Sequence, residues 1–371
     1  MKKFGFGLMR LPLTDPKVAT SVDIEQMKQM VDLFIEKGFT YFDTAWMYVG
    51  FSSENATKTA LVERHPRNTY TLATKLHHGF INTKEDRDKI FNTQLEKTGA
   101  GYFDYYLIHD IEKTNYAKYN QLDCFNWLAD KKAQGLVKHM GFSFHDNADL
   151  LDEVLTAHPE MEFVQLQLNY LDWDSDWVQS RKCYEVCVKH GKPVVVMEPV
   201  KGGMLATPPQ EVVDLLKQAE PESSVASWAI RFAANLEGVI TVLSGMSNVE
   251  QMENNLSYMK DFRKLTPAQE ETIKQAQEVI QKYPIIPCTT CNYCAKVCPQ
   301  NIGISGSFTA MNMYTLYGDL KAAKHQEGWL VGAHGKAHAN ECVQCGMCEE
   351  VCPQHIPIRD NLEKIVETFG L

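Results

Sequence analysis

Two cysteine runs near the C-terminal end constrain this 371-residue chain more than any other feature. The segment "CTTCNYCAKVCP" spans residues 288–299, and "CVQCGMCEEVCP" repeats its spacing at residues 342–353. Of the 11 cysteines, only Cys124, Cys183 and Cys187 lie outside these runs. Disulfide frameworks belong to small secreted domains, not to a large body with so few cysteines. The distribution therefore predicts a metal-binding tail.

The spacing within each run favours iron–sulfur clusters over zinc. Zinc needs four ligands per site, and two runs of four cysteines, each followed by proline, are not typical of it. In the bacterial ferredoxin arrangement, three cysteines of one run and the fourth cysteine of the other hold each four-iron cluster. The proline after the fourth cysteine turns the chain away from the ligand. On this pattern one cluster takes Cys288, Cys291, Cys294 and Cys352, and the other takes Cys342, Cys345, Cys348 and Cys298.

The segment between the runs points to a particular kind of ferredoxin tail. It separates Cys298 from Cys342 by 43 residues, more than in compact bacterial ferredoxins, and its first half has a helical pattern. The tail thus resembles the α-helical ferredoxin type of multi-subunit redox enzymes. Two adjacent clusters can relay single electrons, and a purely structural role is the alternative.

The first 260 residues alternate short β-rich runs with longer amphipathic runs. We expect eight strands, at residues 6–11, 39–45, 69–75, 104–109, 137–144, 162–167, 193–198 and 238–243. Helical spacing lies between them, near 23–38, 52–63, 84–98, 117–134, 147–157, 175–190, 223–235 and 248–259. Thr83, Asn147 and Asn248 are candidate N-caps. This alternation predicts an α/β protein with a (β/α)8 TIM barrel. A doubly wound sheet is the rival, but no G-x-G-x-x-G loop follows the first strand.

A change of composition marks the boundary of a second domain. The segment 264–283 predicts an exposed helix that starts at Thr266-Pro267, and it is followed by "PIIPC", with two prolines in four residues. We therefore predict a barrel domain over residues 1–283 and a small, mainly α-helical, ferredoxin-type 4Fe-4S domain over residues 284–371.

The charge and hydropathy of the chain exclude several classes of partner. The net charge of −10 argues against nucleic acid and against an anionic membrane surface. No apolar run is long enough for a transmembrane helix, and "MKKFGFGLMRLPL" lacks the features of a signal peptide. We expect a cytoplasmic protein.

Four residues at strand ends carry a family resemblance. "FDTAWMY" supplies Asp43 and Tyr48, "LATK" ends with Lys75, and "YYLIHD" contains His109. This order resembles the catalytic tetrad of the aldo-keto reductase family, over about residues 4–260. With the cysteine-rich tail, the chain resembles the ferredoxin-bearing branch of that family.

The residue types suit the reduction of a carbonyl group. Its oxygen gains negative charge and needs a proton, for which the phenol of Tyr48 is the acid. The ammonium of Lys75 lowers the pKa of that phenol, and Asp43 anchors the ammonium. The imidazole of His109 donates a hydrogen bond to the oxygen.

The resemblance also implies a nicotinamide cofactor, NAD(H) or NADP(H). Ser143 and Gln165 match positions that hold the carboxamide, although Phe144 replaces the usual Asn. The tyrosine that commonly stacks on the nicotinamide is replaced by Met197 or Glu198. The phosphate and adenosine segment would contain Gly245, Ser247, Gln251, Asn254 and Asn255. The Lys and Arg that grip a 2′-phosphate are absent from it, so NAD(H) is at least as well supported. A flavin could bridge one- and two-electron chemistry, but no flavin fingerprint is legible.

The function expected from these features is an oxidoreductase of the aldo-keto reductase type. It would reduce a small-molecule carbonyl, or oxidise an alcohol, with NAD(P)(H), and its two [4Fe-4S] clusters would relay electrons to or from a ferredoxin-like or other electron-transfer partner. His77, His78 and His145 are candidates for lining the pocket. Two alternatives stay open: a ferredoxin-linked reductase of another activated substrate without nicotinamide, or a nucleotide-binding redox sensor or regulatory subunit.

Overall fold

The computed structural model describes residues 2–15, 18, 20–175, 178–286, 288, 293–352 and 356–371. Its backbone contacts divide the chain into two compact units. Unit 1 comprises Met1–Leu205 and Ser223–Glu270, and unit 2 comprises Ala206–Glu222 and Glu271–Leu371. The domain boundary at residue 284 stays a prediction.

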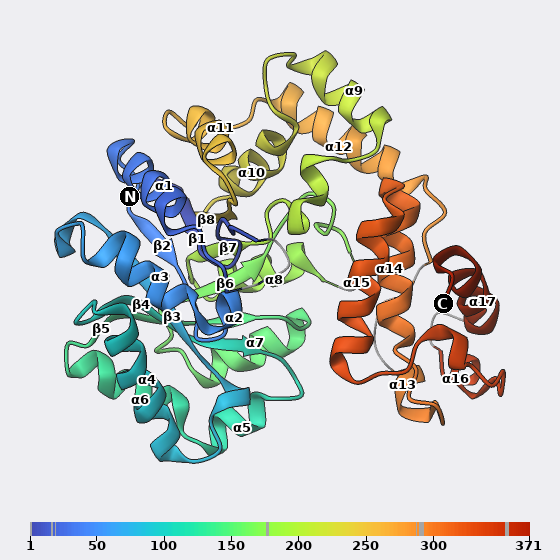
Figure 1. Cartoon of the computed structure of the whole chain (residues 1–371), viewed down its shortest axis with the longest axis horizontal. Helices are drawn as coiled ribbons and strands as arrows, with labels where there is room; N and C mark the ends of the chain where they lie inside the picture. Colours follow the sequence, from blue (N-terminus) through green and yellow to red (C-terminus); the bar gives the residue numbers. More distant parts are fainter. Residues whose placement is uncertain are drawn as a thin grey trace. The chain divides into compact units, whose positions relative to one another are not determined.

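Unit 1 is built around a closed barrel of eight parallel strands in sequential order, so the predicted TIM barrel is confirmed (Figure 1). The strands are β1 Phe4–Gly7, β2 Tyr41–Asp43, β3 Thr71–His77, β4 Phe103–Ile111, β5 Val137–Phe144, β6 Phe163–Gln167, β7 Val194–Met197 and β8 Val239–Gly245. Lys75 pairs with Leu107 and His77 with His109, so the carboxyl ends of β3 and β4 lie side by side.

Buried side chains pack both inside the barrel and between its strands and the surrounding helices. One cluster comes from six different strands: Tyr41, Ala73, Leu107, Phe163, Val195 and Leu243. Layers of inward-pointing side chains of this kind fill the interior of such barrels. A larger cluster packs the strands against the helices. Gly141 lies where β5 approaches β6 closely, because a Cβ there would be 2.4 Å from the carbonyl oxygen of Phe163.

Helices follow the strands of unit 1, and the predicted N-caps are confirmed. Thr83, Asn147 and Asn248 each accept a backbone N–H in the first turn of their helix. The first strand ends at Gly7, earlier than the predicted Leu11, because the chain turns after Leu8. The helices are α1 Ile24–Glu36, α2 Tyr48–Phe51, α3 Ser53–Thr57, α4 Lys84–Thr98, α5 Tyr116–Gln121, α6 Cys124–Ala133, α7 Ala148–Ala157, α8 Ser180–Lys189, α10 Val225–Asn235 and α11 Val249–Met259. Shorter turns are a π-helical turn at Lys58–Val62 and 3₁₀ turns at Arg67–Thr69, His78–Phe80 and Lys201–Ala206.

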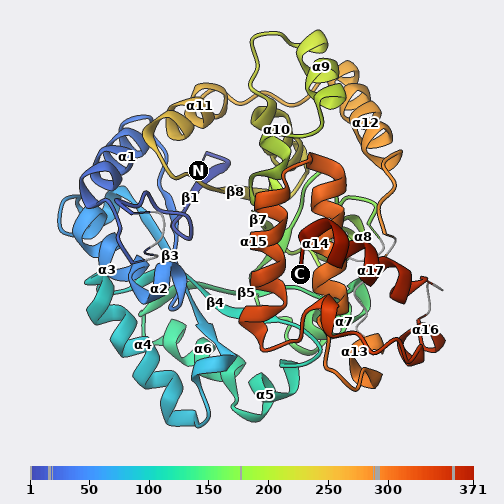
Figure 2. The same ribbon diagram turned by 45° about the vertical axis from the view of Figure 1, so that its right-hand side comes forward.

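Unit 2 is helical where the structure describes it. Its helices are α9 Gln210–Ala219, α12 Pro267–Gln281 (which begins in unit 1), α13 Tyr293–Val297, α14 Ile304–Tyr317, α15 Leu320–Leu330, α16 Met347–Glu350 and α17 Ile358–Phe369, with 3₁₀ turns at Gly332–His334 and Ala339–Glu341. The second half of the segment between the cysteine runs, for which no element was predicted, also forms a helix, α15. It runs beside α14 (Figure 2).

Within the described residues, no helix has both the length and the apolar character needed to cross a membrane.

Candidate active site and cysteine cluster

The four residues of the expected tetrad come together at the carboxyl end of the barrel. Asp43 is the last residue of β2, Tyr48 begins α2, and Lys75 and His109 lie near the ends of β3 and β4. Active sites of TIM barrels lie at this end, because the carboxyl ends of parallel strands meet there.

Lys75 and Asp43 form a buried ion pair. The Nζ of Lys75 lies 2.6 Å from Oδ1 of Asp43 and also donates to the carbonyl of Thr44 at 2.8 Å. Both side chains are almost completely buried. Burial by itself lowers the pKa of Lys75, but Asp43 and Tyr48 outweigh burial and raise it. The pair therefore holds a charged ammonium beside Tyr48.

Tyr48 faces both Lys75 and His109. The Lys75 Nζ lies 4.9 Å from the centroid of the tyrosine ring, and the Tyr48 and His109 rings lie 6.0 Å apart, edge to face. Burial raises the pKa of Tyr48 above its ordinary value, and the ammonium of Lys75 opposes this effect without reversing it. The expected net lowering of this pKa is therefore not seen, because loss of hydration destabilises the phenolate more than Lys75 stabilises it.

His109 is a buried, neutral imidazole. Its pKa is well below the ordinary value because of burial, with the nearby charge of Lys75 as the next cause. Its Nδ1 is buried and has no hydrogen-bond partner among the described residues. A buried polar atom without a partner is costly, so the unpaired Nδ1 is a feature that a packing role alone does not explain.

The three histidines expected to line the pocket gather around Asp110. The Nε2 atoms of His77 and His145 each lie 3.6 Å from a carboxylate oxygen of Asp110, and the rings of His77 and His78 are 4.3 Å apart. Asp110 has a φ of 59° at an irregularity in the pairing of β4 with β5. The sequence analysis did not single out Asp110, although it directly follows His109.

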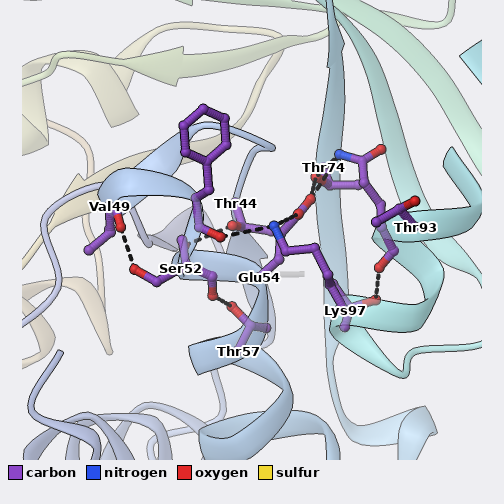
Figure 3. A network of polar contacts seen from close by, with 12 residues as sticks. Thr44, Val49, Ser52, Glu54, Thr57, Thr74, Thr93 and Lys97 are labelled. Atoms are coloured by element: carbon purple, nitrogen blue, oxygen red, sulfur yellow. Dashed lines mark hydrogen bonds and ion pairs between the residues drawn. The ribbon is translucent and has the colours of Figure 1, made fainter. Parts of the chain in front are cut away.

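A second buried carboxylate, that of Glu54 in α3, lies in a network of polar contacts (Figure 3). It accepts hydrogen bonds from Thr74 and Gln94 and pairs with Lys97 at 2.8 Å. Gln94 donates to the carbonyl of Lys75, and Lys97 donates to the carbonyl of Phe51. This network thus links the backbone of Lys75 to the turn that follows Tyr48, and nothing in the sequence pattern signalled it.

The two residues expected to hold a carboxamide lie inside the barrel mouth. Ser143 and Gln165 are paired across β5 and β6, and both are buried. Oε1 of Gln165 has no hydrogen-bond partner in the described part of the chain, while Oγ of Ser143 accepts the N–H of Asp110 at 2.7 Å. Phe144 is buried in the core. Of the two atoms expected to bind a carboxamide, Oε1 of Gln165 is therefore without a described partner and Oγ of Ser143 is shared with Asp110.

The residues of the expected phosphate segment do not all point to a ligand. Gly245 ends β8, and Ser247, Gln251 and Asn254 are exposed around the start of α11. Asn255 is buried, donates to Ser244 and accepts from Tyr258, so its amide is engaged inside the fold.

A cation lies beside this segment, although the sequence analysis found none within it. The side chain of Arg10 packs against Gly245, and its Nη2 would lie 3.4 Å from a Cβ at Gly202. Ser247 donates to the backbone carbonyl of Arg10. The sequence analysis missed Arg10 because it lies 235 residues from Gly245 along the chain.

In unit 2, one pocket gathers the four cysteines expected to hold the second cluster. Cys298, Cys342, Cys345 and Cys348 all line it, together with Ile302, Ile304 and Leu362. Of the other four, Cys294 and Cys352 are buried in the core of unit 2 and Cys288 packs against that core. Cys291 lies outside the described residues. The structure thus brings a cysteine of the first run together with three of the second, as the ferredoxin arrangement requires.

Comparison with known proteins gives the family. The model of the aldo/keto reductase family matches residues 3–278, and that of the 4Fe-4S dicluster domain matches residues 287–357. A curated relative, L-galactose dehydrogenase of Arabidopsis thaliana, is 24% identical over 296 residues, covering 75% of this chain and 90% of the plant protein.

Solved structures of similar fold include two bacterial aldo-keto reductases. One, from Bacillus halodurans in its holo form, has a TM-score of 0.60 at 20% identity, covering 74% of this chain and 91% of the other. A second, from Klebsiella pneumoniae in complex with NADPH, has a TM-score of 0.59 at 17% identity, covering 74% and 95%. The chain belongs to the aldo/keto reductase family of oxidoreductases and carries a 4Fe-4S dicluster domain after its barrel.

Proposed function

We propose that the barrel reduces a carbonyl compound, or oxidises the corresponding alcohol, with NADH or NADPH, and that the dicluster tail relays electrons. The observation that carries this proposal is the buried Asp43–Lys75 pair facing Tyr48, with the neutral imidazole of His109 also beside the phenol.

Each residue of the tetrad has a distinct task in carbonyl reduction. Tyr48 donates its proton to the carbonyl oxygen, and the ammonium of Lys75 stabilises the phenolate that is left. His109 is neutral, so one of its ring nitrogens can donate a hydrogen bond to the same oxygen and hold it in line with Tyr48. A bound reduced nicotinamide supplies the hydride that the carbonyl carbon receives.

The barrel mouth offers suitable groups for such a cofactor. The unpartnered Oε1 of Gln165 can accept an N–H of the carboxamide, and the hydroxyl of Ser143 can donate to its oxygen. Arg10 supplies a cation beside Gly245 and the start of α11, where phosphate groups are favoured. These features support a nicotinamide dinucleotide and do not select between NAD(H) and NADP(H).

The tail offers a suitable donor set for clusters. We assign Cys342, Cys345, Cys348 and Cys298 to one [4Fe-4S] cluster, because they line one pocket. The remaining set, Cys288, Cys291, Cys294 and Cys352, is assigned to the other. Clusters held in this way exchange single electrons.

The test uses the full chain purified without oxygen, with about eight iron and eight sulfide per chain as the loading criterion. Oxidation of NADH and of NADPH is followed with a panel of aldehydes and ketones. We expect Tyr48→Phe to lower kcat by about 10²- to 10⁴-fold. Tyr102→Phe is the control, because its hydroxyl contacts Lys138, away from the tetrad.

Two outcomes would contradict the proposal. Unchanged turnover in Tyr48→Phe would rule out the catalytic role that we propose for the tetrad. Turnover driven by reduced viologen but not by either nicotinamide would favour the reductase that works without nicotinamide.

A further inference from the structure

The second cysteine run reaches the surface of the protein together with apolar side chains. Cys345 is exposed, and the side chains of Val343, Met347 and Val351 are 55%, 39% and 39% exposed. Met347 is the first residue of α16, and Val351, four residues later, is its C-cap. We call Val343, Met347 and Val351, with Cys345 among them, the α16 patch.

The α16 patch borders a redox ligand set, which sets it apart from other exposed apolar residues. Val343 and Cys345 both line the pocket that also contains Cys298, Cys342 and Cys348. Among the described cysteines of both ligand sets, Cys345 is the exposed one, whereas Cys348 of the same set and Cys294 and Cys352 of the other set are 7%, 8% and 9% exposed. Electron transfer between proteins weakens steeply with distance. Because Cys345 is exposed, a partner that binds at the α16 patch can come close to the pocket set.

The surroundings of the α16 patch are acidic. Residues 341–352 contain Glu341, Glu349 and Glu350 and neither Lys nor Arg. Glu341 and Glu350 are exposed, whereas Glu349 is paired with Arg359 at 2.7 Å. Lys296, on α13 beside α16, is an exposed cation in the same region. Four thiolates around a cluster add further negative charge. Such a surface attracts a partner with basic groups around its contact face.

We propose that the α16 patch is the docking surface for a one-electron carrier protein with an apolar contact face and a basic rim. Electrons enter or leave the chain through the cluster held by Cys298, Cys342, Cys345 and Cys348. In each encounter one electron passes between the carrier and this cluster, and no covalent bond forms or breaks. This inference rests on the cluster ligands assigned above, but not on the carbonyl chemistry.

The test measures electron transfer from the loaded, chemically reduced full chain to cytochrome c, a basic one-electron carrier. Val351→Asn and Met347→Gln remove apolar contact without adding charge, and neither residue lines the pocket. We expect each variant to lower the second-order rate constant about tenfold, as truncation of a central contact residue does. Trp329→Gln is the matched control, because Trp329 is 60% exposed on α15 and does not line the pocket.

A second readout is independent of electron transfer. Calorimetric binding of redox-inert, zinc-substituted cytochrome c should weaken in the same two variants and not in Trp329→Gln. The charge reversal Glu350→Lys should also weaken binding and reduce its dependence on salt, with Glu367→Lys on α17 as its control.

The rate at which viologen radical reduces each variant distinguishes a defect in docking from damage to the cluster. Unchanged viologen rates with slowed cytochrome c transfer support the proposal. If both rates fall in Val351→Asn and Met347→Gln, the variant Glu350→Lys decides, because Glu350 does not line the pocket. Normal cytochrome c transfer in Glu350→Lys then overturns the proposal. Equal cytochrome c rates in all variants overturn it too. Loss of a dimer in the patch variants, with unchanged transfer, would instead identify the patch as an interface between two copies.

Discussion

At the scale of single residues, the protonation of Tyr48 and His109 sets the expected pH dependence of carbonyl reduction. Tyr48 must be protonated to act as the acid, and burial raises its pKa above the ordinary value of about 10. The reduction rate should therefore fall only as the pH rises above about 10. His109 has a pKa well below its usual value and stays neutral at pH 7 and above.

We therefore predict a flat pH profile of kcat for reduction between about pH 7 and pH 9. Lys75→Met removes the cation that favours the phenolate, so the pKa of Tyr48 should rise further while kcat falls. Steady-state rates from about pH 7 to about pH 11, for the wild type and Lys75→Met, check both statements, because the range must extend beyond the ordinary tyrosine pKa of about 10. An alkaline decline that begins below pH 9 in the wild type would contradict the assigned state of Tyr48.

Single residues also show how far the sequence could predict the site. The positions of Asp43, Lys75 and His109 could be predicted because each lies near a strand end, and the ends of parallel strands meet at one rim. The role of Asn255 inside the fold could not be predicted. The hydrogen bonds of its side-chain amide with Ser244 and Tyr258 depend on how α11 packs onto β8. Arg10 was missed for the same reason, since its proximity to Gly245 is set by barrel closure.

At the scale of elements, the network around Glu54 joins α3, β3 and α4. Glutamates are mostly exposed, so a sequence reading places Glu54 on the surface. In the structure it is fully buried, with the ammonium of Lys97 as its ionic partner. The left-handed turn through Val49, Gly50 and Phe51 was also unpredictable, because β-branched and bulky residues seldom adopt it.

Lys97→Met should destabilise unit 1 by about 3 kcal/mol or more, because it leaves the buried carboxylate of Glu54 without its charged partner. Lys84→Met in the same helix is the control: its pair with Asp123 is exposed at a separation of 3.5 Å, and its loss should cost about 1 kcal/mol or less. Urea unfolding of the two variants measures the difference. Equal midpoints would show that the Glu54 network does not stabilise the barrel.

Close contact between two strands gives a second prediction about stability. Gly141→Ala adds a Cβ that meets the carbonyl oxygen of Phe163 at 2.4 Å, so β5 and β6 must separate. We expect a loss of about 1–3 kcal/mol. Gly328→Ala is the matched control, because a Cβ there meets nothing within 4 Å and alanine favours the helix α15. Thermal unfolding should show a lower Tm for the first variant and an unchanged or higher Tm for the second.

At the scale of the whole molecule, the two units have separate hydrophobic cores of different kinds. The core of unit 1 is an extensive set of aliphatic and aromatic side chains around the barrel. The core of unit 2 is smaller and includes Cys294, Cys348 and Cys352 among its buried members. The alternation of strands and helices was enough to predict the first core, because burial follows from the period. The core of unit 2 could be predicted only from the expected cluster ligands. The packing of a segment this rich in cysteine depends on the group that the cysteines bind.

Removal of iron should therefore unfold unit 2 and leave unit 1 folded. The cysteine thiolates would repel one another once the metal is gone, and a small core has little further burial to offset their loss. Differential scanning calorimetry of the loaded protein should show two transitions, of which only one moves to lower temperature after treatment with a chelator and an oxidant. The far-ultraviolet signal of the barrel should persist, and so should the nucleotide binding that we propose for unit 1. A joint shift of both transitions would show that the barrel depends on the loaded tail for its stability.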